Sequence, residues 1–176
     1  MYWSALRGVV WDWGDTLMRD LPGQAGPMVS WPRVEAMPGA AAALIALAVV
    51  PLQCVATNAT DSDARDVAAA LERVGLGQYV GRTLTSRELG ARKPDPAFFL
   101  AVARWLGIPA GRLLSVGNDL EKDVLPARAA GLATVWVAGA THDPPPDAVD
   151  LVVPDLDALA RLVERTLLSE RPSTGG

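Results

Sequence analysis

Short apolar runs recur along this chain, separated by stretches with a helical pattern. Six runs have the length of β-strands, and the first two are apolar enough to be covered on both faces of a sheet. They lie at residues 8–11, 52–56, 80–84, 113–116, 134–137 and 151–153. Strands alternating with helices predict a parallel sheet with right-handed crossovers. The expected fold is a three-layer α/β/α sandwich with a mostly parallel, Rossmann-like central sheet.

The stretches between these runs carry helix signals. Pro38 suits the first turn of a helix over residues 39–48. Asp61 or Ser62 is expected to cap the next helix, and Gly75 to end it. Further helices are expected at 97–106, up to about residue 130, and at 155–168.

Two features of the sequence predict core positions. In the helix expected at 97–106, Phe98, Val102 and Trp105 recur at helical spacing, so all three are expected to face inwards. Cys54 lies within an apolar run and is expected to be an inert core residue. As the single cysteine it excludes an internal disulfide, which fits a reducing compartment.

Residues 18–37 interrupt the alternation of strands and helices. This stretch has no sustained period and contains Pro22, Gly23, Gly26, Pro27 and Pro32. Loops of this length are usually functional, and this one is too short to fold as a second domain. We therefore expect a single domain over 1–169, with a short loop insertion at 18–37 in place of a cap, and a disordered tail at 170–176.

The composition narrows the classes of protein to which the chain can belong. It has 176 residues, half of them apolar, with a net charge of −4 and a pI near 4.9. This length suffices for one domain with its own core. The acidic balance leaves little positive charge for nucleic-acid phosphates. The longest apolar stretch, 40–50, is too short to span a bilayer, and no signal peptide is apparent. A cytoplasmic protein without membrane attachment is expected, and a homo-oligomer is compatible with the composition.

Polar residues with related chemistry stand where the predicted strands end. The carboxyl ends of parallel strands meet at one edge of a sheet, where ligands of open α/β proteins bind. Carboxylates grouped there suit Mg²⁺, and a hydroxyl with a lysine ammonium suits the oxygens of a phosphoryl group. The residues concerned are Asp12, Thr57, Lys93, Asn118, Asp119 and Asp123.

These residues resemble the four sequence motifs of the haloacid dehalogenase (HAD) superfamily, in the same order, between about Val9 and Val137. The matching segments are Asp12-Trp13-Gly14-Asp15-Thr16-Leu17, Thr57-Asn58, Lys93-Pro94-Asp95-Pro96, and Gly117-Asn118-Asp119 followed by Asp123. The resemblance implies a HAD-type phosphatase that hydrolyses phosphomonoesters with Mg²⁺ through an aspartyl-phosphate. It implies the following roles: Asp12 as nucleophile, Thr57 and Lys93 in catalysis, Thr57, Asn58 and Lys93 on the substrate, and Asp12, the Gly14 carbonyl, Asn118 and Asp123 on the metal.

Two positions depart from the family pattern. Family phosphatases usually carry an acid–base Asp two residues after the nucleophile, where this chain has Gly14. Asp15 either takes over that role or turns its side chain away into the loop. The family's first metal carboxylate is replaced by Asn118, so the metal site depends on an uncharged amide unless Asp119 or Asp123 compensates.

Parts of the same sequence pattern also occur in proteins with other activities. Dehalogenases and phosphonoacetaldehyde hydrolases of the superfamily lack the acid–base Asp, but they carry a helical cap that residues 18–37 do not provide. A different reading is a HAD-fold protein with little turnover that binds a phosphorylated ligand or a partner protein. Trp13 either flanks the substrate or packs in the core; Trp3, Trp31 and Trp136 either line the site or pack; and His142 is expected in an exposed loop.

Overall fold

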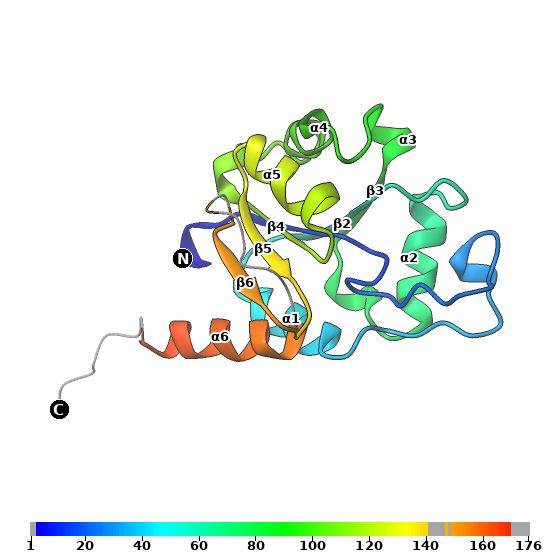
Figure 1. The fold of residues 1–176 in the computed structure, drawn as a ribbon, viewed down its shortest axis with the longest axis horizontal. Helices are drawn as coiled ribbons and strands as arrows, with labels where there is room; N and C mark the ends of the chain where they lie inside the picture. The colour runs from blue at the N-terminus through cyan, green and yellow to red at the C-terminus, as the bar shows by residue number, and fades with distance from the viewer. Residues whose placement is uncertain (1–2, 141–146, 148, 170–176) are drawn as a thin grey trace.

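The computed structural model describes residues 3–140, 147 and 149–169, and shows a sheet of six parallel strands (Figure 1). The strands lie in the order β3-β2-β1-β4-β5-β6. Their bounds are Gly8–Trp11 (β1), Gln53–Thr57 (β2), Arg82–Thr85 (β3), Leu113–Gly117 (β4), Ala133–Val137 (β5) and Leu151–Val153 (β6). All six expected strands are present, shifted by at most two residues at each end. The predicted tail at 170–176 and the loop residue His142 lie outside the described residues.

Helices cover both faces of this sheet (Figure 1). One face is covered by α1 (Ala40–Ala46), α2 (Ala64–Arg73) and α6 (Leu156–Ser169). The other is covered by α4 (Pro96–Leu106) and α5 (Leu125–Ala129), with the short α3 (Ser86–Leu89) beside α4. A π-helical segment, Leu120–Val124, leads into α5. The predicted three-layer α/β/α sandwich is confirmed.

Strand β1 shows why an unbroken apolar run was needed at the centre of the sheet. Val9 and Trp11 pack into the core on the α1/α2/α6 side, whereas Val10 packs into the core on the α4/α5 side. Because successive side chains of a strand point to opposite faces, a strand covered on both sides buries every side chain, and a polar residue within it needs a hydrogen-bond partner, as Gln53 of β2 has in Trp11. The first polar residue after the run is therefore delivered to the end of the strand.

Two local predictions were wrong. Helix α2 is capped by Asp63, whose carboxylate accepts hydrogen bonds from the backbone N–H groups of Arg65 and Asp66, rather than by Asp61 or Ser62. In α4 Phe98 is fully buried as predicted, but Trp105 in the last turn is 52% exposed. The helical period predicts which way a side chain points around the helix axis. It does not predict whether the neighbouring elements extend far enough along α4 to cover its last turn.

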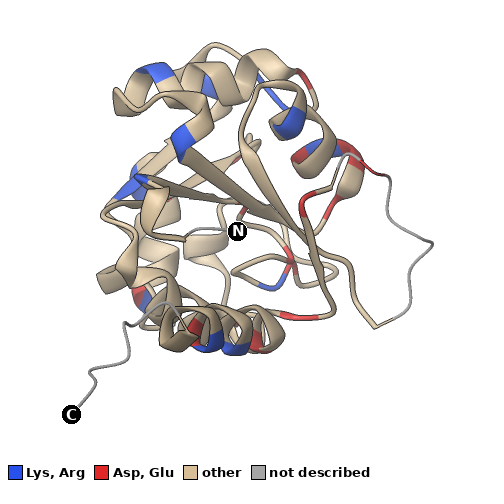
Figure 2. Ribbon diagram, turned by 90° about the vertical axis from the view of Figure 1, so that its left-hand side faces the viewer, with Lys and Arg blue, Asp and Glu red and all other residues tan. Residues whose placement is uncertain are grey.

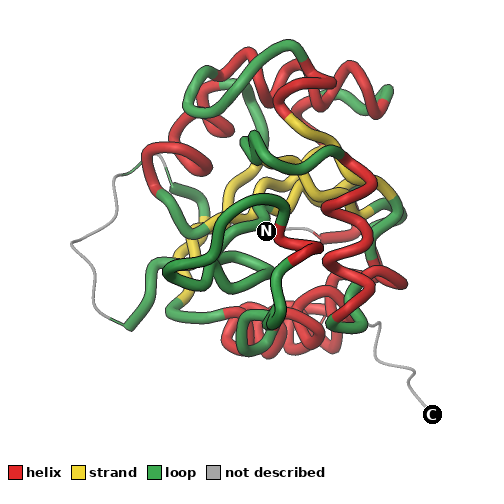
Figure 3. Tube along the Cα trace, turned by 90° about the vertical axis from the view of Figure 1, so that its right-hand side faces the viewer, coloured by secondary structure: helices red, strands yellow, loops and turns green. Residues whose placement is uncertain are grey.

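The loop at 18–37 is fastened to the body of the protein. Met18 forms isolated bridges with Gly14 and Ala36, and a single turn of 3-10 helix, η2 (Met28–Ser30), packs against α2. Viewed from the side of α2, loop segments pass in front of the strands (Figure 3). This loop is therefore a fixed wall at the edge of the sheet.

The outer helix α6 is charged as well as apolar. Basic and acidic residues are intermixed along α6 (Figure 2). Within the described part of the chain, no helix is both long and apolar enough to cross a membrane.

Candidate active site

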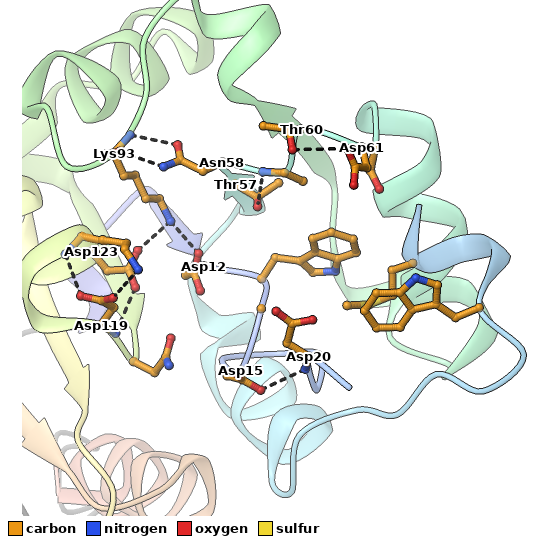
Figure 4. A pocket seen from close by; sticks show the side chains of 18 of the residues that line it. Asp12, Asp15, Asp20, Thr57, Asn58, Thr60, Asp61, Lys93, Asp119 and Asp123 are labelled. Carbon is orange, nitrogen blue, oxygen red and sulfur yellow. Dashed lines mark hydrogen bonds and ion pairs between the residues drawn. The ribbon is translucent and has the colours of Figure 1, made fainter. Parts of the chain in front are cut away.

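The site lies where the strand order of the sheet reverses. Strand β1 pairs with β2 on one side and β4 on the other, so their carboxyl ends form a crevice at the switch point of the topology. Asp12 follows β1, Thr57 ends β2, and Asn118 follows β4. A cavity of about 510 Å³ opens there (Figure 4). It is lined by all the residues predicted for the site: Asp12, Gly14, Asp15, Thr57, Asn58, Lys93, Asn118 and Asp123.

A buried lysine joins two carboxylates at the centre of this site. Lys93 Nζ lies 2.7 Å from Asp12 Oδ1 and 2.7 Å from Asp123 Oδ1 (Figure 4). The side chains of Lys93 and Asp123 are each 4% exposed, whereas that of Asp12 is 14% exposed. Asp12 is thus the member of the three that a ligand in the cavity reaches most readily.

Burial and neighbouring charges shift the pKa values of this group. Burial raises the pKa of Asp123 to about 6; the charge of Asp12 adds to the rise, and Lys93 opposes it. Burial lowers the pKa of Lys93, but the carboxylates of Asp12 and Asp123 more than offset this and leave it raised. Lys93 is therefore a permanent cation at the centre of the site.

Asn58 holds Lys93 in place through the backbone. Its Nδ2 donates to the Lys93 carbonyl at 2.8 Å, and its Oδ1 accepts from the Lys93 N–H at 2.9 Å. Neighbouring Thr57 accepts a hydrogen bond from the Ala59 N–H at its hydroxyl. Both residues line the cavity. The side-chain contacts that the structure shows for Asn58 are with the backbone of Lys93. A contact of Thr57 or Asn58 with substrate stays a prediction.

Thr16 is a site residue whose role was not predicted from the sequence. Its hydroxyl lies 3.0 Å from both Asp12 Oδ2 and Asn118 Oδ1, and it accepts a hydrogen bond from the Asn118 N–H. Thr16 is fully buried and thereby ties the end of β1 to the end of β4. Its position four residues after Asp12, within the first motif, was the only available signal.

The structure shows where the two residues at the acid–base position lie. Asp15 has a left-handed backbone (φ 52°), and its Oδ1 accepts a hydrogen bond from the Asp20 N–H at 2.9 Å (Figure 4). Asp15 lines the cavity, but this carboxylate oxygen is directed to the loop backbone. At Gly14 an added Cβ would meet no atom within 4 Å, so the position has room for a side chain.

Asp119 and Asn118 play different parts at the start of the π-helical segment. The Asp119 carboxylate caps that segment by accepting from the N–H groups of Glu121 and Lys122, and it pairs with Lys122 Nζ at 2.9 Å. The amide oxygen of Asn118 instead lies beside Asp12, at the Thr16 hydroxyl. Of these two candidates for a metal ligand, the geometry favours Asn118.

The oxygen atoms around Asp12 fit a hard divalent cation. Asp12 and Asp123 carry two negative charges against the single positive charge of Lys93. The one proton of the Thr16 hydroxyl satisfies only one of Asp12 Oδ2 and Asn118 Oδ1 at a time. Among the described residues, no three His, Cys, Asp or Glu side chains form a metal-binding group. A cation here would therefore depend on the Asn118 amide and the Gly14 carbonyl as well as the carboxylates.

A family model and several solved structures are similar to this chain. The family model described as HAD-hydrolase-like matches residues 90–159, which include Lys93, Asn118 and Asp123. An uncharacterized protein from Listeria monocytogenes serotype 4b has a similar structure, with a TM-score of 0.73 and 26% identity over 93% of this chain and 98% of that one. The chain is therefore similar to HAD-like hydrolases, both in fold and in the segment that carries three of its site residues.

The relatives of this HAD-like chain include several named phosphatases. A glyceraldehyde 3-phosphate phosphatase of Methanopyrus kandleri is 32% identical over 49% of this chain and 37% of its own length. A phosphoglycolate phosphatase of Pseudomonas fluorescens is 37% identical over 57% of this chain and 38% of its own. The chain thus spans less than two fifths of these relatives. A HAD-hydrolase of Bacillus subtilis bound to magnesium shares the fold, with 15% identity and a TM-score of 0.69 over 90% of this chain and 98% of that one.

Proposed function

We propose that this HAD-like chain hydrolyses a small phosphomonoester with Mg²⁺, through an aspartyl-phosphate on Asp12. The observation that carries the proposal is the ion-paired Lys93, buried between Asp12 and Asp123 at the base of an open cavity. A carboxylate held beside a fixed cation is suited to attack phosphorus, because the cation offsets the charge that gathers there. The named phosphatases among the relatives support the same chemistry.

The proposed reaction has two displacements at phosphorus. In the first, an oxygen of Asp12 forms a bond to phosphorus while the bond from phosphorus to the leaving oxygen breaks. Lys93, the Thr57 hydroxyl and Asn58 are proposed to hold the phosphoryl oxygens. In the second, water attacks phosphorus, loses a proton, and the bond to Asp12 breaks. The leaving oxygen takes up one proton from solvent and the attacking water releases one to solvent, so the products are the alcohol, inorganic phosphate and the free Asp12 carboxylate.

The proposed Mg²⁺ ligands are Asp12, the Gly14 carbonyl, Asn118 and Asp123. When bound, the ion would lower the cost of bringing an anionic phosphate to a site with excess negative charge. Asn118 and Gly14 are uncharged ligands, so we expect weaker binding than at a site with a further carboxylate.

Proton transfer to the leaving group is the step for which this site is least equipped. No side chain stands at Gly14, and one carboxylate oxygen of Asp15 is engaged by the Asp20 N–H. A positioned acid–base group contributes roughly 10²–10⁴-fold. We therefore expect slow turnover of alkyl phosphates, whose leaving oxygen needs a proton, and faster turnover of aryl phosphates.

The proposal is tested by following phosphate release from an aryl phosphate in Mg²⁺ and by mass analysis of the quenched protein. We expect a phosphoryl adduct on Asp12 during turnover. Turnover without any phosphoryl adduct, even after rapid quenching, would contradict the covalent route.

A second candidate function is supported by the same departure at Gly14. A HAD-fold protein lacking the acid–base group would bind a phosphorylated ligand or partner protein with little turnover. Inorganic phosphate or vanadate binding by a protein that releases no phosphate from aryl or alkyl esters would favour it.

A further inference from the structure

Part of the cavity wall beyond Asp12 is apolar and aromatic. Trp13 follows the nucleophile directly, and Met28 and Trp31 come from the loop at 18–37. All three line the same cavity as Lys93, and each is less than a tenth exposed, so their surroundings hold them firmly. The buried indole N–H of Trp13 has no hydrogen-bond partner among the described residues.

Arg73 holds this wall in position from behind. Its Nη1 donates to the carbonyls of Val29 and Trp31 at 2.8 and 2.7 Å, and its Nη2 to that of Pro32 at 3.4 Å. The Trp31 indole N–H in turn donates to the Gly26 carbonyl at 3.1 Å. The wall is thus formed before any ligand arrives, which lowers the entropic cost of binding a flat group against it.

The outer part of the cavity is acidic. Asp15, Asp20 and Asp61 line it, and in Figure 4 Asp61 lies on the side of Asp12 opposite to Asp123. The two lysines that line the cavity already have partners: Lys93 with Asp12 and Asp123, and Lys122 with Asp119. A second negative charge on a substrate would therefore lie near these carboxylates, and neither lysine of the described cavity lining is free to pair with it. Binding of such a substrate would be disfavoured.

We propose that the wall of Trp13, Met28 and Trp31 binds an aromatic leaving group, and that the acidic outer part of the cavity selects against leaving groups with a negative charge. The substrate class is then a phosphomonoester of an aromatic alcohol or phenol that is neutral or positively charged. This inference deepens the proposed function and rests on it. It separates this chain from enzymes for small carboxylated phosphates, because their second charge has no counter-ion here.

The test uses three esters whose leaving alcohols differ little in basicity: benzyl, cyclohexylmethyl and 4-carboxybenzyl phosphate. With leaving-group chemistry matched, differences in kcat/KM report recognition. We expect benzyl phosphate to exceed cyclohexylmethyl phosphate by roughly threefold to tenfold, as for an aromatic contact. The carboxylated ester should be about fivefold poorer than benzyl phosphate, and added salt should narrow that gap because the carboxylates are exposed.

Two Trp31 variants and a matched control assign the effect to the wall. Trp31→Leu should raise KM for benzyl phosphate with little change in kcat, and Trp31→Phe should restore most of the preference for the aromatic ester. Trp105→Leu is the control, because Trp105 is exposed on α4 and does not line the cavity. Thermal unfolding of each variant checks that the comparison is made on folded protein.

Binding of benzylphosphonate and cyclohexylmethylphosphonate, measured by calorimetry, separates this inference from the proposed function. Preferential binding of benzylphosphonate without turnover of any ester would overturn the phosphatase and leave the aromatic site standing. Turnover without preference for the benzyl ester, or equal effects of Trp31→Leu and Trp105→Leu, would overturn the aromatic site alone. Absence of both binding and turnover would overturn both.

Discussion

The side-chain amide of Asn58 binds both backbone polar groups of Lys93, at 2.8 and 2.9 Å. The residue that follows Thr57 thus positions the cation that faces Asp12. This contact joins the end of strand β2 to the segment before α4, between residues 35 apart in sequence, so the geometry of the site depends on the Asn58 amide.

Asn58→Ala is expected to lower both stability and turnover. It leaves the Lys93 N–H and carbonyl without their partner, at a cost of about 1–3 kcal/mol, and releases the Lys93 ammonium from a fixed position. Urea unfolding and phosphate release measure the two effects. Gln78→Ala is the matched control, because Gln78 also donates to a backbone carbonyl but is exposed and does not line the cavity. Equal losses in the two variants would argue against a positioning role.

Asp12→Asn is expected to abolish turnover while leaving the fold intact. The amide is nearly isosteric but is a poor nucleophile, and Lys93 keeps Asp123 as an ion-pair partner. Phosphate release and the cooperativity of urea unfolding are the measurements, with Glu164→Gln on the exposed side of α6 as a charge-matched control. Activity retained by a cooperatively unfolding Asp12→Asn protein would sink the assignment of the nucleophile.

Mg²⁺ is expected to raise the melting temperature, because a ligand that binds only the folded state stabilises it. Asp123→Ala should remove this response. Asn118→Asp should strengthen it and lower the Mg²⁺ concentration needed for half-maximal effect, since an amide ligand becomes a carboxylate. Titrations of Mg²⁺ after EDTA treatment test all three proteins. An unchanged melting temperature and rate in wild-type protein would show that the metal site is wrong.

Gly14→Asp is expected to accelerate alkyl phosphates more than aryl phosphates, by up to roughly 10²-fold. The cavity has room for the new side chain, and only alkyl leaving groups depend strongly on a proton. Asp15→Asn is the companion variant: it keeps an oxygen for the Asp20 N–H, and Asn tolerates the left-handed backbone. If Asp15 is the acid–base group, Asp15→Asn should instead cut alkyl turnover and Gly14→Asp should add nothing. No change in either variant on either ester would refute this account of proton transfer.

Asp123 is expected to make the apoprotein less stable as pH rises from about 4 to above 6. Its pKa is raised from 3.8 to about 6 by burial, so the folded state binds more protons than the unfolded state over this range. The stabilisation is complete below pH 3.8 and is lost as pH passes through 6, with a ceiling of about 3 kcal/mol. The free energy of unfolding of wild type and Asp123→Asn is measured in urea at pH 4.5 and 7.5. The change between the two pH values is then compared for the two proteins. A wild-type profile that matches Asp123→Asn throughout would exclude this contribution.

Much of the framework could be predicted from order along the chain. Apolar runs of strand length, alternating with helices, imply a parallel sheet, because a strand covered on both faces is composed mainly of apolar residues. The same pattern explains why Asp12, Thr57 and Asn118 lie together: each stands at the carboxyl end of β1, β2 or β4. Period and position along the chain are local properties, and these predictions needed nothing else.

Tertiary structure decided which of several plausible side chains acts at each place. Asp63, and not its neighbours, caps α2, because capping depends on the backbone angles of one residue. The Asp15 carboxylate accepts a hydrogen bond from the loop backbone, and the Asn58 amide binds the Lys93 backbone. The Thr16 hydroxyl lies between Asp12 and Asn118, at the ends of two strands. None of these directions is encoded in spacing, since each contact joins groups whose separation is set by the packing of other elements. The sequence by itself determined which chemical groups reach the edge of the sheet; the packing of the loop and helices around that edge decided which of them face one another.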